Sequence, residues 1–223
     1  MNTTAHHTTA ILLFSRSAEA EVCTKDFGVG GMSAQRLAAA LIRRTDKTLA
    51  ATNYPVHRFD ETRQRGHSFG ERLANAMADV FALGYQNLLV VGNDAPDLHA
   101  GLLRRAASEL ARGRSTLVPD HRGGVALLGI TAQQFLSLEL EQLSWETEFI
   151  FQELAIALPT AWIGSRVRDI NFNRDLRAIW FRVRSVFGHL AAAIFGLSAI
   201  AISPVFVSAT SFRTATLRGP PAR

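Results

Sequence analysis

The sequence of 223 residues contains one cysteine, Cys23. A single cysteine excludes an intrachain disulfide and a zinc site made of several thiolates, and it is compatible with a reducing compartment. A chain of this length can bury a core that is large enough to fold without such cross-links. We therefore expect one main domain with a cytoplasmic location.

Lysine is almost as scarce: Lys25 and Lys47 are the only two, so 22 of the 24 basic residues are arginines. The formal net charge is +5 at pH 7. Arginine suits bidentate recognition of phosphate and carboxylate groups, although a GC-rich genome produces the same bias without any function. The chain has no zinc finger, no aromatic RNA-recognition motif and no lysine-rich arm, so no specific nucleic-acid partner is expected.

Long apolar runs are scarce too, with one exception near the C-terminus. Residues 10–14 form an apolar run that is too short for a secretory signal, and Arg16 follows it, so no such signal is expected. Residues 185–212, in contrast, contain no Asp, Glu, Lys or Arg. This length exceeds the roughly 20 apolar residues that span a bilayer, but glycines, serines and Pro204 interrupt it. Three alternatives stay open: membrane contact, packing on the domain or in a homodimer, and a loosely ordered tail.

The rest of the chain alternates short apolar runs with amphipathic segments. Strands are predicted at residues 10–14, 56–59, 87–91, 115–118 and 125–130. Helices are predicted from Ser33 to about residue 49, from Ser68 to about Gly84, around residues 102–113 and at residues 145–158, with a loop at residues 15–31. The second helix has the strongest signal, because Ser68 and Glu71 form a capping box. This alternation predicts an α/β fold with a mostly parallel sheet between two helical layers, whose ligands bind at the carboxyl ends of the strands.

The stretch "VVGNDAPDL", residues 90–98, places two acids directly after a predicted strand. Asp94 and Asp97 offer hard oxygen ligands on a short loop that a proline stiffens. Magnesium in proteins is usually held by one or two carboxylates together with substrate phosphates. The alternative is structural, with Asp94 capping a turn and Asp97 capping the next helix. The spacing alone does not decide between the two.

A second stretch, "PDHRGGVALLGI", covers residues 119–130. Gly123 and Gly124 allow a ligand to approach the backbone closely, and Asp120 and Arg122 stand beside them. The alternative is a tight turn that joins two strands and has no ligand.

A third stretch, "SRVRDINFNRDLRAIW", covers residues 165–180. Asp169, Asn171 and Asp175 lead there into a predicted helix. Acids at such a position are also favoured by the helix dipole alone, which is the structural alternative.

Together, "FGERLANAMADVFALGYQNLLVVGNDAPDL", "LVPDHRGGVALLGI" and "RDINFNRDL" resemble the ordered motifs of an uncharacterised bacterial branch of the GT-A, or nucleotide-diphospho-sugar transferase, superfamily. Some members are labelled as glycosyltransferases associated with arsenosugar biosynthesis. The resemblance covers about residues 10–180, and three motifs in the same order carry it. The matching positions are Asp94, Pro96, Leu98, Gly123, Gly124, Asp169 and Asp175. The resemblance implies a GT-A, Rossmann-like three-layer domain at residues 10–180, followed by a hydrophobic and basic C-terminal tail at residues 181–223.

The sequence departs from this family in four places, one of which is that Val125 and Ala126 replace the aromatic pair after the double glycine. The acid before the double glycine is replaced by Arg122, and the middle acid of the last motif is Asn171. The phosphate loop after the first strand keeps only Arg16 and Lys25 as phosphate partners. An arginine in place of a metal-facing carboxylate either substitutes for the charge of the ion or abolishes the chemistry.

The resemblance implies a metal-dependent glycosyltransferase that uses a nucleotide-sugar donor. Asp94, with Asp169 or Asn171, would hold a divalent ion, Mg²⁺ or Mn²⁺. Phosphate or nucleotide contacts are expected from Arg16, Lys25, Arg122, Gly123 and Gly124, and Asp97 and Asp120 are the candidate catalytic residues. Two alternatives remain: a nucleotidyltransferase of the same fold, and a catalytically degenerate protein that binds a nucleotide or a protein partner. Association with a membrane through the tail is a further possibility.

Overall fold

The computed structural model of the chain describes residues 8–195, apart from the side chains of Val186 and Ala193. Its centre is a six-stranded sheet in the order β2-β1-β3-β5-β4-β6. β5 is antiparallel to β3 and β4, whereas the other neighbouring strands pair in parallel. The strands are β1 (Thr9–Phe14), β2 (Val56–Phe59), β3 (Asn87–Val91), β4 (Thr116–Pro119), β5 (Val125–Thr131) and β6 (Trp162–Ile163). The sheet is therefore mostly parallel, as predicted.

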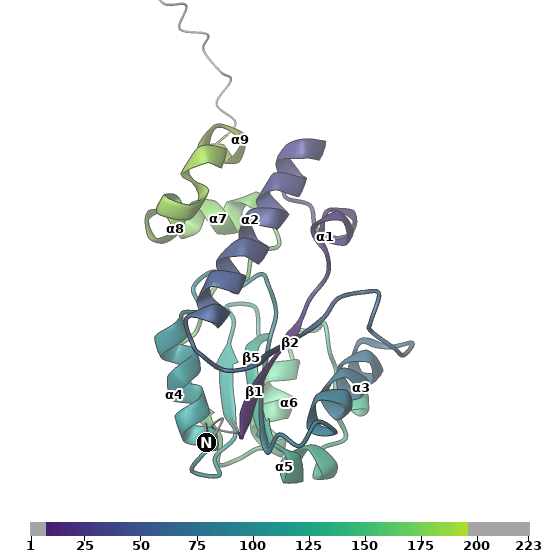
Figure 1. Ribbon diagram of the computed structural model, residues 1–223. Helices are drawn as coiled ribbons and strands as arrows, with labels where there is room; N and C mark the ends of the chain where they lie inside the picture. The colour runs from purple at the N-terminus through teal and green to yellow at the C-terminus, as the bar shows by residue number, and fades with distance from the viewer. Residues whose placement is uncertain (1–7, 196–223) are drawn as a thin grey trace, which may run out of the picture.

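Helices cover both faces of the sheet, because its central strands are apolar on both sides. β1 and β3 are buried along their whole length. Leu12 and Val90 belong to one core cluster, which packs under α3 (Phe69–Phe81) and α6 (Ile150–Ala157). Leu13 and Val91 belong to the opposite cluster, under α4 (Ala100–Leu110). Figure 1 shows α3 and α4 on opposite sides of the strands, which gives the expected three layers.

The local helix signals were accurate where a side chain caps the helix. In α3 the Ser68 hydroxyl accepts a hydrogen bond from the Glu71 backbone N–H at 3.0 Å, and the Glu71 carboxylate accepts one from Ser68 at 3.3 Å. Asp97 is not the N-cap of α4, which was the structural alternative considered for this residue. Its N-cap is His99, whose Nδ1 accepts a hydrogen bond from the Leu102 N–H at 3.2 Å.

Three helix boundaries differ from the prediction. The expected loop at residues 15–31 contains α1 (Ala18–Thr24), which is capped by the Ser17 hydroxyl and carries two acids in its first turn. α2 (Gly31–Ala50) begins two residues before Ser33. α6 begins at Ile150 rather than Trp145, because Glu146 has a positive φ of 61° that a right-handed helix does not allow.

The described C-terminal helices pack on α2. They are α7 (Asn173–Ala178), α8 (Trp180–Phe187), a 3₁₀ turn (Gly188–Leu190) and α9 (Ala191–Phe195). Phe187 and Ile194 share a buried cluster with Leu37 and Leu41 of α2. Figure 1 shows α2 extending beyond the sheet, with α7, α8 and α9 on one side of it and α1 on the other. Between β5 and α6, the chain forms α5 (Ala132–Ser137) and a 3₁₀ turn (Leu140–Gln142).

The apolar segment at residues 185–212 is only partly covered by the structure. Residues 185–195 form the end of α8, the 3₁₀ turn and α9, and residues 196–212 lie outside the described residues. Within residues 8–195, no helix combines the length and the apolar character that a membrane crossing requires.

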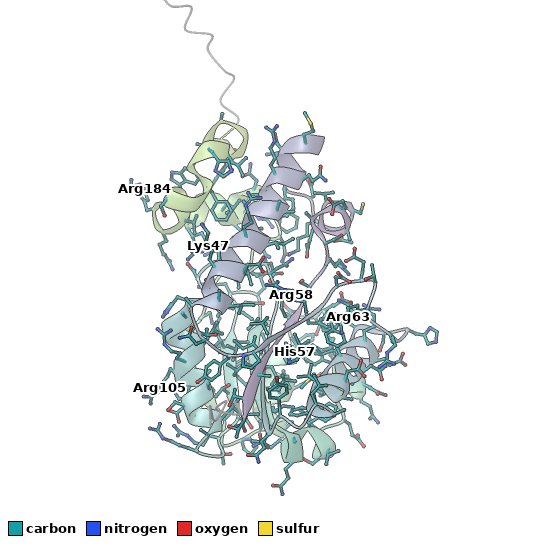
Figure 2. All side chains as sticks on the ribbon, viewed as in Figure 1. Lys47, His57, Arg58, Arg63, Arg105 and Arg184 are labelled. Atoms are coloured by element: carbon teal, nitrogen blue, oxygen red, sulfur yellow. The ribbon has the colours of Figure 1, made fainter. Side chains whose placement is uncertain are left out.

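The arginines are spread over the described part of the molecule. Figure 2 shows Arg105 on α4, Arg58 on β2 and Arg184 on α8, at different heights along the molecule. Several arginines pair with nearby acids; Arg58, for example, contacts Asp46 at 2.6 Å. The buried carboxylate of Glu109 is surrounded by Arg105, Arg112 and Arg114.

Phe187→Ala should lower the free energy of unfolding by about 3–5 kcal/mol, the usual cost of emptying a buried aromatic site. Phe187 is 0% exposed in its contact with α2. Phe181→Ala is the matched control, because Phe181 lies on the same helix and is 83% exposed. Urea unfolding of both variants tests this. Equal losses would contradict the packing of α8 on α2.

Candidate functional site

The loops that carry the three motifs meet at the carboxyl edge of the sheet. The Ile170 N–H donates to the Asp94 carbonyl oxygen at 2.8 Å, which joins the third motif to the first. Asp120 forms a parallel bridge with Val167, which brings the second motif alongside. The Asn93 side chain donates to the Arg16 carbonyl oxygen at 3.3 Å. Segments far apart in the sequence thus form one site, as expected for parallel strands.

A cavity of about 430 Å³ opens between the ends of β1 and β3; we call it the first cavity. Its size falls within the usual range for small-molecule sites. Its charged and polar lining includes Arg16, Glu21, Lys25, Arg72, Asp94 and Asn171. Four of the residues predicted from the sequence, Arg16, Lys25, Asp94 and Asn171, therefore line the same space.

The Lys25 ammonium lies between two carboxylates in this cavity. Its Nζ is 2.9 Å from Asp94 Oδ2 and 3.2 Å from Glu21 Oε2. Burial alone would lower the pKa of Lys25, but the charges of Asp94 and Glu21 outweigh burial and leave that pKa raised. Lys25 therefore keeps its positive charge, although its side chain is only 13% exposed.

Arg122 joins the second and third motifs. Its guanidinium is 2.9 Å from Asp169 Oδ2 and 2.7 Å from Asp175 Oδ2. Burial alone would lower the pKa of Arg122, but its hydrogen bond to Asp175 and the charges of both acids raise that pKa. The arginine that replaces an acid of the family motif is thus already engaged by two other acids.

Asp175 organises the start of α7. Its Oδ2 accepts hydrogen bonds from the backbone N–H groups of Asn171 at 3.1 Å and Phe172 at 2.8 Å. Burial would raise the pKa of Asp175, but the hydrogen bond from Arg122 and these two N–H groups lower it. Asp175 lines neither cavity described here. It holds the Arg122 side chain and the start of α7 in position.

Asp169 has an oxygen with no partner among the described residues. Oδ2 accepts from Arg122 and from the Asn171 side chain, but Oδ1 is buried and receives no hydrogen bond. Burial raises the pKa of Asp169, and the carboxylate of Asp120 raises it further, while Arg122 offsets only part of this. Burial is therefore the main reason why the pKa of Asp169 is raised.

A second cavity, of about 590 Å³, adjoins the first. Five residues line both cavities: Phe69, Val125, Trp145, Glu146 and Asn171. The second cavity also contains Asp120, Arg122, Gly124, Glu148 and Asp169. Predicted residues of the second and third motifs thus meet here, beside those of the first.

The double glycine allows close packing of the protein on itself. Gly123 has a φ of +87°, and a Cβ there would overlap the backbone carbonyl oxygen of Glu148. A Cβ at Gly124 would overlap Asp120 Oδ2. Asp120 Oδ1 accepts from the N–H groups of Arg122 at 2.6 Å and Gly124 at 2.9 Å, and so closes the turn.

Asp97 lies outside both cavities. Its Oδ2 is 3.1 Å from Arg182 Nη1, which ties the loop after β3 to α8. Its neighbour Pro96 is held by Arg44 of α2, whose Nε donates to the Pro96 carbonyl oxygen at 2.8 Å. Of the two acids of "GNDAPDL", Asp94 therefore lines the first cavity, whereas Asp97 ties the loop to α8.

The carboxylates present fit a divalent ion that is shared with a ligand. Asp94 Oδ1 and Asp169 Oδ1 receive no hydrogen bond from the described residues, although each Oδ2 is paired with a cation. Both are hard oxygen donors on neighbouring segments. No group of three or more His, Cys, Asp or Glu residues suited to a metal occurs within residues 8–195. Such an ion would therefore depend on ligand phosphates to complete its coordination.

Sequence reasoning missed the wall between the two cavities. Trp145 and Phe69 form it, with ring centroids 5.3 Å apart, and the Trp145 indole N–H donates to the Leu140 carbonyl oxygen at 2.6 Å. Glu146 stands beside them in a left-handed conformation. Because a helix was predicted from residue 145, Trp145 and Glu146 were not expected to line a cavity. No local signal in "SWETEF" indicates a positive φ.

Asp175→Asn should lower the free energy of unfolding at pH 7 by about 2–4 kcal/mol, because it breaks a buried charge pair. The lowered pKa of Asp175 means that its stabilisation is present above the unfolded value near 4 and is lost as the pH falls through the folded value. The gap between the variant and the natural chain should therefore shrink below about pH 4. Urea unfolding at several pH values measures this difference in stability. Asp79→Asn is the control, because Asp79 belongs to an exposed ion pair with Arg65. A gap independent of pH would refute this role.

Gly123→Ala should lower stability by about 2–5 kcal/mol, since it combines a left-handed backbone with a backbone overlap. Gly113→Ala is the control: its φ is +79°, but no atom lies within 4 Å of the added Cβ. That variant should lose only about 1–2 kcal/mol. Thermal unfolding of both compares them, and equal losses would contradict the close approach to Glu148.

The fold of this chain is shared by a protein of solved structure. A protein of solved structure from Desulfovibrio desulfuricans G20, described as a "putative nucleotide-diphospho-sugar transferase", superposes with a TM-score of 0.73 and 20% identity. The match covers 85% of this chain and 98% of the other. It shows that the two share a fold, which confirms the predicted GT-A-like α/β architecture.

Other solved structures are more distant. Rv0371c from Mycobacterium tuberculosis H37Rv has a TM-score of 0.45 and 13% identity over 77% of this chain and 97% of its own. A cytidylyltransferase from Leptospira borgpetersenii has a TM-score of 0.45 and 12% identity over 86% of this chain and 99% of its own. No curated protein matches the sequence significantly. Residues 30–147, more than half of the chain, match the model of a family described as "Uncharacterized protein conserved in bacteria" (DUF2064), and the chain belongs to that family.

Proposed function

We propose that the protein is a glycosyltransferase that uses a nucleotide-sugar donor, with the donor diphosphate bound in the first cavity. One observation carries the proposal: a buried, charged Lys25 meets Asp94 at the carboxyl edge of the sheet, in a cavity of suitable size. Ligands of open α/β sheets bind at this edge. The shared fold with the Desulfovibrio protein supports the same class of ligand.

The charges of the first cavity suit a diphosphate only together with a cation. Arg16, Lys25 and Arg72 supply positive charge, and Glu21, Asp94 and Glu146 supply negative charge. Lys25 is held in place by its two acids, so little side-chain freedom is lost when it meets a phosphate. The anions around it would nevertheless repel a diphosphate unless a further cation screened them.

A divalent ion fits this requirement. Asp94 and Asp169 would hold it through their free oxygens, with the Asn171 side chain beside them. When bound, the ion would neutralise charge on the diphosphate leaving group. The protein's own part is to bind and orient: Arg16 and Lys25 face the phosphates, while Phe69 and Trp145 offer aromatic surface to the rest of the donor.

A second candidate is a protein of this fold that binds a nucleotide without turnover. The observation in its favour is that Lys25 and Arg122 already neutralise Asp94 and Asp169. These internal pairs would satisfy both acids without a metal ion. The two candidates differ in one measurable property, because only the glycosyltransferase requires metal-dependent nucleotide binding.

Thermal unfolding of the full chain should distinguish them. We expect one nucleoside diphosphate or nucleotide sugar, from a panel of uridine, guanosine, cytidine, adenosine and thymidine compounds, to raise the Tm by about 5–10 °C at 100 times its Kd. The shift should require MgCl₂ or MnCl₂. The full chain is needed, because Phe187, Leu190 and Ile194 are buried against α2.

Two variants from one loop sharpen the test. Asp94→Asn should abolish the metal-dependent part of the Tm shift, because it removes one of the two free carboxylate oxygens. Asp97→Asn should keep the shift, because Asp97 lies outside both cavities and pairs with Arg182. A shift of the same size in the absence of metal would favour the second candidate. The absence of any shift in the folded chain would refute nucleotide binding.

A further inference from the structure

The second cavity adjoins the first and shares five lining residues with it. Phe69, Trp145 and Glu146 belong to the lining of both cavities. The first cavity contains Lys25 and Arg16, whereas neither lines the second. A molecule in the second cavity would therefore lie on the side of the donor that faces away from Arg16 and Lys25.

The side chains of the second cavity carry mainly negative charge. Four acids line it: Asp120, Glu146, Glu148 and Asp169. Its one cation among the described residues, Arg122, is already paired with Asp169 and Asp175. A phosphate monoester would bring about two further negative charges to Asp120, Glu146 and Glu148, which form no ion pair within the described residues, and like charges in contact disfavour binding strongly. A neutral or positively charged molecule meets no such penalty.

Glu146 occupies the boundary between the cavities. It is the only residue with a titratable side chain among the described residues that line both. Its side chain is exposed and takes part in no ion pair or hydrogen bond within the described part of the chain. A carboxylate in this state is free to accept a proton from a bound ligand.

The backbone of Glu146 is held in an uncommon conformation. Its φ of 61° is rare for a residue other than glycine, and such residues concentrate at functional sites. Its neighbours fix the turn: Trp145 donates to the Leu140 carbonyl oxygen, and the Thr147 hydroxyl donates to the Ser144 carbonyl oxygen at 2.6 Å. The carboxylate is therefore presented on a constrained turn.

We propose that the second cavity is the acceptor site, that its acceptor is a hydroxyl compound without a phosphate group, and that Glu146 receives the proton of the reacting hydroxyl. This inference rests on the proposed glycosyl transfer. It disfavours nucleotidyl transfer to a sugar phosphate, because that acceptor is an anion.

The reaction is balanced without a further reagent. The acceptor hydroxyl oxygen forms a bond to the anomeric carbon of the donor, and the bond between that carbon and the diphosphate oxygen breaks. The nucleoside diphosphate leaves with the electron pair of that bond. The hydroxyl proton passes to the Glu146 carboxylate and later to water.

Ligand-observed NMR on the full chain tests the acceptor class. The probes are glucose, glucosamine, glycerol and myo-inositol, each measured against its monophosphate, with MgCl₂ and with UDP, GDP, CDP or ADP present. At least one unphosphorylated compound should bind, and its monophosphate should bind at least tenfold more weakly. Tighter binding of a monophosphate, or binding of none of the compounds, would overturn the proposal. Failure of every nucleotide to bind is a separate result, which refutes the proposed function instead.

Release of nucleoside diphosphate from UDP-glucose, GDP-mannose and related nucleotide sugars, measured together with the unphosphorylated compound that binds, tests Glu146. Glu146→Gln should reduce release at least a hundredfold, the usual contribution of a general base. A metal-dependent Tm shift with nucleotide should persist, because Glu146 is not among the residues proposed to hold the phosphates or the metal ion. Glu139→Gln is the control, because Glu139 is exposed and lines neither cavity. Release within threefold of that of the natural chain in Glu146→Gln would overturn the role of Glu146.

Glu146→Gly separates this role from a structural one. Glycine adopts a positive φ without strain, so this variant should be at least as stable as the natural chain. It should still lose release to the same extent as Glu146→Gln. Full release in a stable glycine variant would contradict the catalytic role.

Discussion

Arg122 holds the carboxyl edge of the sheet together. The acids that it joins, Asp169 and Asp175, follow it by about 50 residues in the chain, and each is partly or fully buried. Two carboxylates and a guanidinium in such surroundings are stable only as a set, because any one alone would be a buried and unpaired charge. This set fixes the start of α7, and the Ile170–Asp94 hydrogen bond then fixes the loop after β3. The walls of both cavities depend on these contacts.

Two cations of the site neutralise acids of the family motifs. Arg122 brings a positive charge where the resembling proteins have an acid, and Lys25 brings another beside Asp94. Both cations lie against acids that the resemblance assigns to a metal ion. The site therefore combines internal charge pairs with two free carboxylate oxygens. This mixture makes the site less acidic than one that is lined by metal-binding carboxylates alone.

How much the sequence could predict depends on whether the signal was local. The capping box of Ser68 and Glu71 and the apolar strands are local, and both were predicted correctly. The meeting of the motifs followed from the parallel sheet, because carboxyl ends of parallel strands share an edge. The pairing of Lys25 with Asp94, 69 residues apart, depends on how α1 folds back, and α1 itself was expected to be a loop. The left-handed turn at Glu146 left no trace in the sequence.

The ion pair between Asp97 and Arg182 connects the loop after β3 with α8. Asp97 lies three residues after Asp94, and Arg182 lies on a helix that packs against α2. The contact stabilises the docked position of α8 and the present conformation of the loop after β3 together. Docking of α8 favours the present conformation of the loop after β3 by the amount by which that conformation favours docking, and this amount is below about 1 kcal/mol because the Arg182 side chain is 67% exposed. The C-terminal helices are thus thermodynamically linked to the edge of the first cavity.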